Sequence, residues 1–285
     1  MIYELGNFKS YKEVLDFVPR SVWEINGRTK EIKQMFLDDV TKHTCKRTKK
    51  GIAVSIKQNY SVFNPILGMN ILKIWSNKND NVIDPYAGRD RALITNFMQR
   101  NYHGLEICPK TFNQLKQKIK NWQYKNTQYF CEVFLEDGTK PFPDNYPILN
   151  ESYYDFCYSC PPYWFKESYE EVPGEISHLK TEMEWRTAIT KCASYLSRVL
   201  KDKAYAVFVL ADIRHKGHLI PLHSHWIEEF INSGFKLKDI VINKTNPMTC
   251  AGINGYLRNR IMQKSHEYLL VFQKENYNKN HIYRP

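Results

Sequence analysis

Several features that would assign this chain to a familiar class are missing from it. No run of 18 apolar residues occurs, and the N-terminus lacks the basic-then-apolar pattern of an export signal. We therefore expect a cytoplasmic protein that is neither exported nor membrane-spanning. Cys157 and Cys160 form a C-x-x-C arrangement, but no second pair or histidine follows at zinc-site spacing. The seven scattered cysteines predict reduced thiols and no metal site.

A glycine-rich nucleotide motif is also absent. The chain has 12 glycines in 285 residues, and none forms the G-x-G-x-x-G pattern that holds the pyrophosphate of a dinucleotide. This argues against a dinucleotide cofactor. Acidic residues are the minority, with 30 Asp and Glu against 41 Lys and Arg, which gives a net charge of +11. That surplus favours a polyanionic partner such as nucleic acid, although on charge alone a basic protein without such a partner is nearly as common.

From residue 60 onward, short apolar segments alternate with segments of helical periodicity. Strands are predicted over 81–84, 102–107, 129–135, 153–159, 205–210, 237–243 and 268–272, and helices over 65–75, 91–100, 109–122, 182–200 and 222–232. Such alternation predicts an α/β, doubly wound, mainly parallel seven-stranded sheet. We assign residues 60–274 to this domain, 1–59 to a basic N-terminal extension and 275–285 to a loose tail.

Two tight turns follow predicted strands. Asp84-Pro85-Tyr86-Ala87-Gly88 ends the first strand, and Ser159-Cys160-Pro161-Pro162-Tyr163 ends the fourth. A Pro-Pro pair stops a strand, because proline has a fixed φ and no N–H for the ladder. In doubly wound sheets, ligands bind beyond the carboxyl ends of the strands. We therefore expect both turns to face one ligand, although the second could simply end a strand and place Tyr163 in the core.

Two acidic residues follow the next strands. Glu106 ends the second strand, about twenty residues after Asp84, where an acid usually accepts from a ribose diol. Asp137 lies near the end of the third strand and could accept from an adenine amino group. Each signal is weak alone, and their order and spacing together are more specific.

The combination of turns resembles the amino-directed DNA methyltransferases that use S-adenosylmethionine, in particular a phage and prophage branch with Ser-Cys-Pro-Pro-Tyr at the second turn. Residues 61–65, 208–214 and 264–266 extend the resemblance, which covers residues 60–274. It implies a Rossmann-like methyltransferase fold, S-adenosylmethionine as cofactor and methylation of adenine N6 or cytosine N4 in flipped DNA bases. DNA is the implied partner, in DNA modification or restriction–modification. The resemblance is compatible with a dimer and leaves a partner nuclease open.

The motifs and the resemblance together nominate site residues. The cofactor would contact Phe63, Asn64, Pro65, Asp84, Tyr86, Gly88, Glu106 and Asp137. The catalytic positions would be Cys160, Pro161, Pro162 and Tyr163, where backbone carbonyls accept from the target amine and the tyrosine stacks on the base. Trp164 would wall the base slot, and Lys46, Arg47, Lys49, Arg258, Arg260 and Lys264 would hold DNA.

Other interpretations stay open at this level. The fold could serve an RNA-directed methyltransferase, or a degenerate DNA-binding protein in which Asp90 and Cys160 replace more usual residues. Asp90 stands where a left-handed glycine is common in the family. Cys160 as a nucleophile toward a pyrimidine carbon is disfavoured, because that chemistry uses a Pro-Cys order. Residues 165–181 are expected to form a flexible insertion, and Asp212 to pair with Arg214 or cap a turn.

Overall fold

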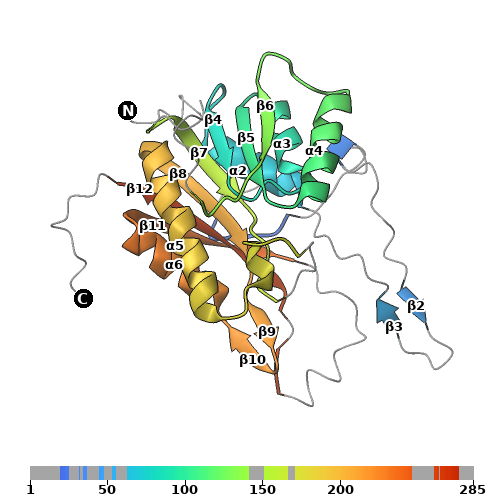
Figure 1. Cartoon of the computed structure of the whole chain (residues 1–285), viewed down its shortest axis with the longest axis vertical. Coiled ribbons are helices and arrows are strands. Elements are labelled where there is room, and N and C mark those ends of the chain that lie inside the picture. The colour runs from blue at the N-terminus through green and yellow to red at the C-terminus, as the bar shows by residue number, and fades with distance from the viewer. Residues whose placement is uncertain are drawn as a thin grey trace.

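All seven predicted strands lie in one sheet (Figure 1). The computed structural model describes residues 20–25, 32, 35–36, 63–140, 151–165, 171–245, 260–262 and 264–275, and the backbone of 45–47 and 53–55. The sheet order is β1-β11-β12-β8-β7-β4-β5-β6. Its strands are β1 (Val22–Trp23), β4 (Asn81–Asp84), β5 (Asn101–Glu106), β6 (Cys131–Leu135), β7 (Tyr154–Ser159), β8 (Leu200–Leu210), β11 (Phe235–Lys244) and β12 (His266–Lys274).

The sheet is mainly parallel, as predicted. Strands β4 to β8 run in one direction, and β12 runs antiparallel to both β8 and β11. The predicted α/β doubly wound class is confirmed. An eighth strand, β1, pairs in parallel with β11 and comes from the segment predicted as an N-terminal extension. Its anchor is Trp23, which is buried and stacks on Trp75 with 5.8 Å between ring centroids.

In the part of the chain that the structure describes, five helices with defined bounds cover the two faces of the sheet. They are α2 (Pro65–Trp75), α3 (Arg91–Phe97), α4 (Pro109–Asn121), α5 (Glu182–Val199) and α6 (Leu222–Asn232). Helix α2 is N-capped by Asn64, whose side chain accepts from the Ile66 N–H at 3.1 Å. Helix α5 begins with a capping box between Thr181 and Glu184. These starts lie where the sequence predicted them.

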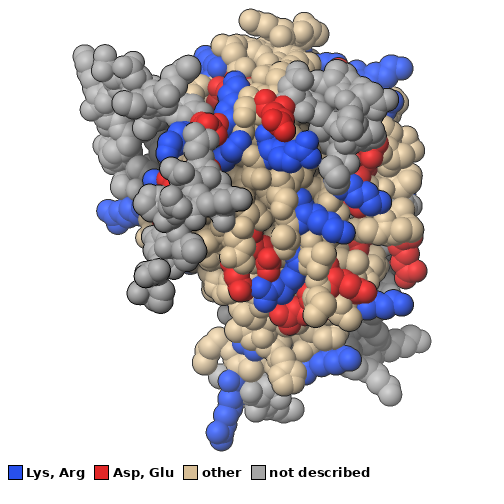
Figure 2. Space-filling view, turned by 60° about the vertical axis from the view of Figure 1, so that its left-hand side comes forward, with Lys and Arg blue, Asp and Glu red and all other residues tan. Residues whose placement is uncertain are grey.

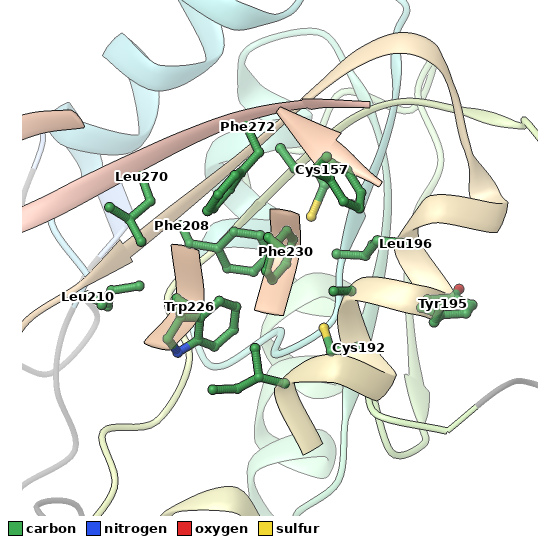
Figure 3. Packing of buried hydrophobic residues seen from close by; sticks show 14 of the residues in the cluster. Cys157, Cys192, Tyr195, Leu196, Phe208, Leu210, Trp226, Phe230, Leu270 and Phe272 are labelled. Atoms are coloured by element: carbon green, nitrogen blue, oxygen red, sulfur yellow. The ribbon is translucent and has the colours of Figure 1, made fainter. Parts of the chain in front are cut away.

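Two apolar cores flank the sheet. Successive residues of a strand point to opposite faces, so that Val82 packs toward α2 and α3 while Ile83 packs toward α5. Figure 3 shows the core that contains Ile83 and helices α5 and α6. The ring centroid of Phe208 in β8 lies 4.7 Å from that of Trp226 and 4.9 Å from that of Phe230, both in α6. Cores on both faces hold the strands rigidly and so fix the turns at the carboxyl edge.

Two small hairpins lie outside the main sheet. Strands β2 (Cys45–Arg47) and β3 (Ala53–Ser55) pair antiparallel, as do β9 (Ile213–His215) and β10 (His218–Ile220). A 3-10 turn, η2, covers Ile176–His178. Most of the predicted extension 1–59 and all but the first residue of the tail 275–285 lie outside the described residues, so those boundaries stay predictions. Within the described ranges, no helix is long and apolar enough to cross a membrane.

Candidate active site

The two turns singled out in the sequence meet at the carboxyl edge of the sheet. Strands β4 and β7 are neighbours, with Val82 opposite Phe156. From β4 the chain passes through α3 to β5 on one side, and from β7 it passes through α5 to β8 on the other. The turns that leave these strands therefore open between them the crevice where doubly wound sheets bind ligands.

A cleft with about 810 Å³ of atom-free space, which includes open solvent, occupies this crevice. Seven predicted site residues line it, namely Phe63, Tyr86, Gly88, Glu106, Asp137, Cys160 and Pro162. It is also lined by residues that were not predicted to belong to the site, including Arg89, Ile107, Cys108, Thr111, Gly138, Gly174, Glu175 and Ile176.

Asp84 lies beneath the cleft as a fully buried anchor. Its carboxylate accepts from Arg91 Nε at 2.7 Å, Tyr102 OH at 3.0 Å, Ser159 Oγ at 2.5 Å and the Tyr86 N–H at 3.1 Å. One side chain thus joins the turn after β4, strand β5 and the end of β7. Direct contact of Asp84 with a cofactor stays a prediction, and the structure gives its carboxylate a positioning role.

Arg91 is the main site residue that the sequence did not reveal. Its guanidinium is buried at the start of α3, pairs with Asp84, lies 5.3 Å from the Phe63 ring centroid and donates to the Tyr86 carbonyl. Burial is the largest single effect and lowers the pKa of Arg91, but the charge and hydrogen bond of Asp84, together with smaller effects of Cys160 and Tyr102, raise the pKa above the ordinary value. A basic residue at a helix start carries no sequence signal of this role, because its partner comes from a strand.

Glu106 connects the ends of β4 and β5. Its Oε2 accepts from the Gly88 N–H at 3.0 Å, and its Oε1 accepts from the Cys108 N–H at 2.9 Å. Burial raises the pKa of Glu106 from 4.5 to about 7, against the lowering effect of these two hydrogen bonds. The carboxylate retains lone pairs on the cleft side that could accept from a diol.

Close backbone packing shapes the floor and wall of the cleft. A Cβ at Gly138 would lie 2.0 Å from the Pro85 carbonyl oxygen, so only glycine allows these loops to touch. Gly174 has φ +93° and approaches Asp137 so closely that an added Cβ would lie 2.8 Å from Oδ2. Asp137 Oδ1 accepts from the Thr139 N–H and hydroxyl.

The segment after the second turn is packed, contrary to the predicted flexible insertion. Within 171–181, Glu175 and Ile176 are each 2% exposed and line the cleft. Glu175 accepts from the Ser177 N–H at 3.1 Å and hydroxyl at 2.5 Å. The prediction rested on Pro173 and Gly174, but the buried side chains that follow them hold the segment against the sheet edge. Residues 166–170 lie outside the described residues.

The second turn places its residues at different depths. Cys160 is half-buried, and both it and Pro162 face the cleft, whereas Pro161 is buried. Tyr163 is 6% exposed, donates to Glu267 Oε1 at 3.3 Å and lies beneath Lys264, whose Nζ is 5.8 Å from the ring centroid. Stacking of Tyr163 on a base stays a prediction.

Trp164 lies in the core rather than along the cleft. Its Nε1 donates to the Leu179 carbonyl at 2.7 Å. Its ring stacks on Trp185 with 5.5 Å between the ring centroids. Asn64 and Pro65 also do not line the cleft, because they form the start of α2 behind Phe63. These three positions were nominated by their motifs, and the structure gives each a packing or capping role.

Asp90 does not need the left-handed conformation expected for it. Its φ is −134°, and its Oδ1 lies 2.6 Å from Lys118 Nζ. Asp212 likewise lies 2.7 Å from His223 Nδ1 rather than pairing with Arg214, and its Oδ1 also accepts from the His223 N–H at 3.3 Å at the start of α6, in agreement with the alternative that it caps a turn. Both corrections have one cause, since the actual partner comes from a helix that sequence spacing does not place.

The predicted DNA-contacting residues are only partly described. The backbone of Lys46 and Arg47 lies in β2, and Lys49 and Arg258 fall outside the described residues. Arg260 and Lys264 are exposed, and Lys264 donates to the Asp212 carbonyl. Only Lys264 of this group is placed beside the second turn by a described contact, and DNA binding by the group stays a prediction.

Comparison with known proteins finds a family model that is similar to part of the chain. Residues 154–284 match a family model described as DNA methylase, N6_N4_Mtase. The resemblance to amino-directed DNA methyltransferases is thereby confirmed over this part of the chain. None of the curated protein sequences matches the chain.

Three solved structures illustrate what the fold is similar to. A SAM-dependent methyltransferase from Methanosarcina mazei is 11% identical, with 72% of this chain and 97% of that chain covered and a TM-score of 0.48. TrmN from Thermus thermophilus is 11% identical. The match covers 74% of this chain and 48% of TrmN, with a TM-score of 0.47. A candidate DNA modification methylase from Thermus thermophilus is 19% identical over 50% of each chain, with a TM-score of 0.33. These similarities are distant, and the roles of the site residues rest on their own geometry.

Proposed function

We propose that this protein transfers a methyl group from S-adenosylmethionine to the exocyclic amine of adenine or cytosine in DNA. The observation that carries the proposal is the single cleft shared by the turns after β4 and β7. Gly88 and Glu106 line it from one side, and Cys160 and Pro162 from the other. A donor and an acceptor bound by these two turns would therefore meet without a large movement of the chain.

The residues of the cleft fit this cofactor. Glu106 offers a carboxylate for two ribose hydroxyls, and Ile107 beside it offers an apolar wall for a flat base. Gly88, with φ +62°, lets a ligand approach the backbone. Bound S-adenosylmethionine supplies an activated methyl group on a sulfonium sulfur.

The second turn would activate the acceptor. An exocyclic amine is a weak nucleophile because its lone pair is delocalised into the ring. Backbone carbonyls at Cys160 and Pro161 would accept its two hydrogens and favour a pyramidal nitrogen, and the proline pair keeps those carbonyls fixed. The target base must leave the duplex to reach this turn.

Product analysis tests the proposal directly. The protein would be incubated with duplex DNA and methyl-labelled S-adenosylmethionine, and the DNA digested to nucleosides for mass spectrometry. We expect N6-methyladenine or N4-methylcytosine nucleosides. Label found only in a matched RNA, only at carbon 5 of cytosine, or in no product would contradict it.

Cofactor affinity should depend on pH through Glu106. The ionised carboxylate accepts from both ribose hydroxyls, whereas the protonated form cannot, so affinity rises as pH increases through the pKa of about 7. Titration calorimetry should show binding about 10-fold weaker at pH 6 than at pH 8. Glu106→Gln should bind weakly at both pH values. An equal affinity of the unmodified protein at pH 6 and 8 would refute the role of Glu106.

Replacing Cys160 with serine should preserve methyl transfer. The proposed mechanism uses the carbonyl of residue 160 rather than its side chain, so Cys160→Ser should retain a turnover rate of the same order. A thiol nucleophile would instead be lost entirely. Single-turnover assays on duplex DNA distinguish these outcomes, and complete inactivity of a folded Cys160→Ser protein would refute the carbonyl mechanism.

A further inference from the structure

The hairpin β9–β10 projects from the main sheet at the same edge as the cleft. It follows β8, whose carboxyl end lies beside that of β7 (Figure 1). Its strands pair His215 with His218 and Ile213 with Ile220. The sequence predicted no strand in 211–221.

The tip of this hairpin has a defined geometry. Lys216 and Gly217 form a two-residue loop, with φ 48° and 84°. Two positive φ values are those of the tight turn that matches the twist of paired strands, so the tip is held by its own backbone. A Cβ added to Gly217 would meet nothing within 4 Å. The tip therefore reaches into open space.

The exposed side chains of the hairpin include two cations, Arg214 and Lys216, beside the exposed Leu219 of β10. Arg214, Lys216 and His218 are exposed, and the one acid in 211–221, Asp212, is buried and paired with His223. At the lower end of Figure 2, below the acidic side chains, the coloured charged residues are basic. Such a surface suits phosphate groups.

Two contacts tie the hairpin to the second turn of the cleft. The ring of Phe165, two residues after Tyr163, stacks on the His215 ring with 4.4 Å between the ring centroids and 22° between the ring planes. Phe165 has φ 57°, and its N–H donates to the Ser177 carbonyl at 3.1 Å, so its backbone is held. Lys264 spans from the Asp212 carbonyl to the Tyr163 ring. A duplex held by the hairpin would therefore lie beside the proposed acceptor slot.

We propose that hairpin β9–β10 is a duplex-DNA-binding element, in which Arg214 and Lys216 contact phosphates flanking the target base. This rests on the proposed function and assigns a binding surface to its substrate. A two-stranded ribbon is narrow enough for the major groove of B-form DNA, whereas the deep, narrow major groove of A-form RNA excludes it. The geometry therefore favours DNA over RNA.

The test compares two double variants with the same change of charge. Arg214→Ala/Lys216→Ala removes the hairpin cations, and Lys78→Ala/Lys238→Ala removes two exposed cations at the opposite edge of the sheet. Binding to a DNA duplex and to an RNA duplex of matched sequence would be followed by fluorescence anisotropy over a range of salt concentrations. Melting temperature and S-adenosylmethionine affinity show that each variant is folded.

We expect the hairpin variant to bind DNA at least 10-fold more weakly than the unmodified protein. The slope of the logarithm of the association constant against the logarithm of the salt concentration should be shallower by about 2. The control variant should keep the affinity and slope of the unmodified protein. Equal DNA binding by the two variants, or a loss on RNA alone, would overturn the proposal. If the unmodified protein methylates DNA while both variants bind it equally, the hairpin inference fails alone. If the unmodified protein does not methylate DNA, the proposed function fails first.

Discussion

Replacing Asp84 with alanine is expected to lower the free energy of unfolding by about 3–5 kcal/mol, the cost of leaving one partner of a buried ion pair alone. Arg91 would keep its charge in a site where its side chain is 5% exposed. The hydroxyls of Tyr102 and Ser159 would lose their acceptor as well. Urea denaturation followed by circular dichroism measures the change. Cofactor binding should weaken in the same variant, because the turn after β4 loses its anchor.

A double-mutant cycle separates the ion pair from general damage to the core. Arg91→Met removes the charge that Asp84 neutralises, so Asp84→Ala/Arg91→Met should be more stable than Asp84→Ala alone. Should Asp84→Ala fail to fold, Asp84→Asn keeps the shape and can be placed in the same cycle. Strictly additive losses of stability would show that the pair does not hold the site.

Replacing Tyr163 with leucine should reduce methyl transfer by about 5- to 150-fold, the equivalent of the 1–3 kcal/mol that stacking of a base on an aromatic ring supplies. Leucine fills much of the same space, which limits the loss of packing at a position only 6% exposed. The expected loss requires the ring to become accessible beside Pro162 when DNA binds. Steady-state rates on duplex DNA give the measurement.

Two controls make this result specific. Tyr163→Phe keeps the ring and removes the hydroxyl that donates to Glu267, so it should retain most of the activity. Cofactor affinity should be unchanged in both variants, because the ring lies outside the residues that line the cofactor cleft. A Tyr163→Leu protein with the activity of Tyr163→Phe would show that Tyr163 is only a core residue.

The order of elements was predictable because it depends on local periodicity. Helices α2 and α6 begin and end at the predicted residues, and β4 does so as well. Strand β1 was missed because two residues, Val22 and Trp23, have no measurable period. Hairpin β9–β10 was missed for the same reason, since its two strands have three residues each.

The candidate site was predictable where its residues belong to turns with special backbone chemistry. Gly88, Cys160 and Pro162 were named from their turns, and Glu106 from its spacing, and all four line one cleft. Arg91 and Glu175 were missed because buried charges depend on partners distant in sequence. Trp164 was predicted to line the base slot because it follows the Pro-Pro pair. The sequence does not distinguish an aromatic residue that faces a ligand from one that stacks on a core residue, as Trp164 does on Trp185.

The sequence by itself determined the succession of strands and helices, the places where proline and glycine end them, and the surplus of positive charge. These properties are local, since each depends on residues within a few positions of one another. The tertiary structure alone decided that Asp84 lies buried against Arg91 and Ser159, and that Phe165 stacks on the hairpin that carries Lys216. Burial and ion pairing arise only when separate segments pack. The spacing of residues along the chain does not specify which segments pack against each other.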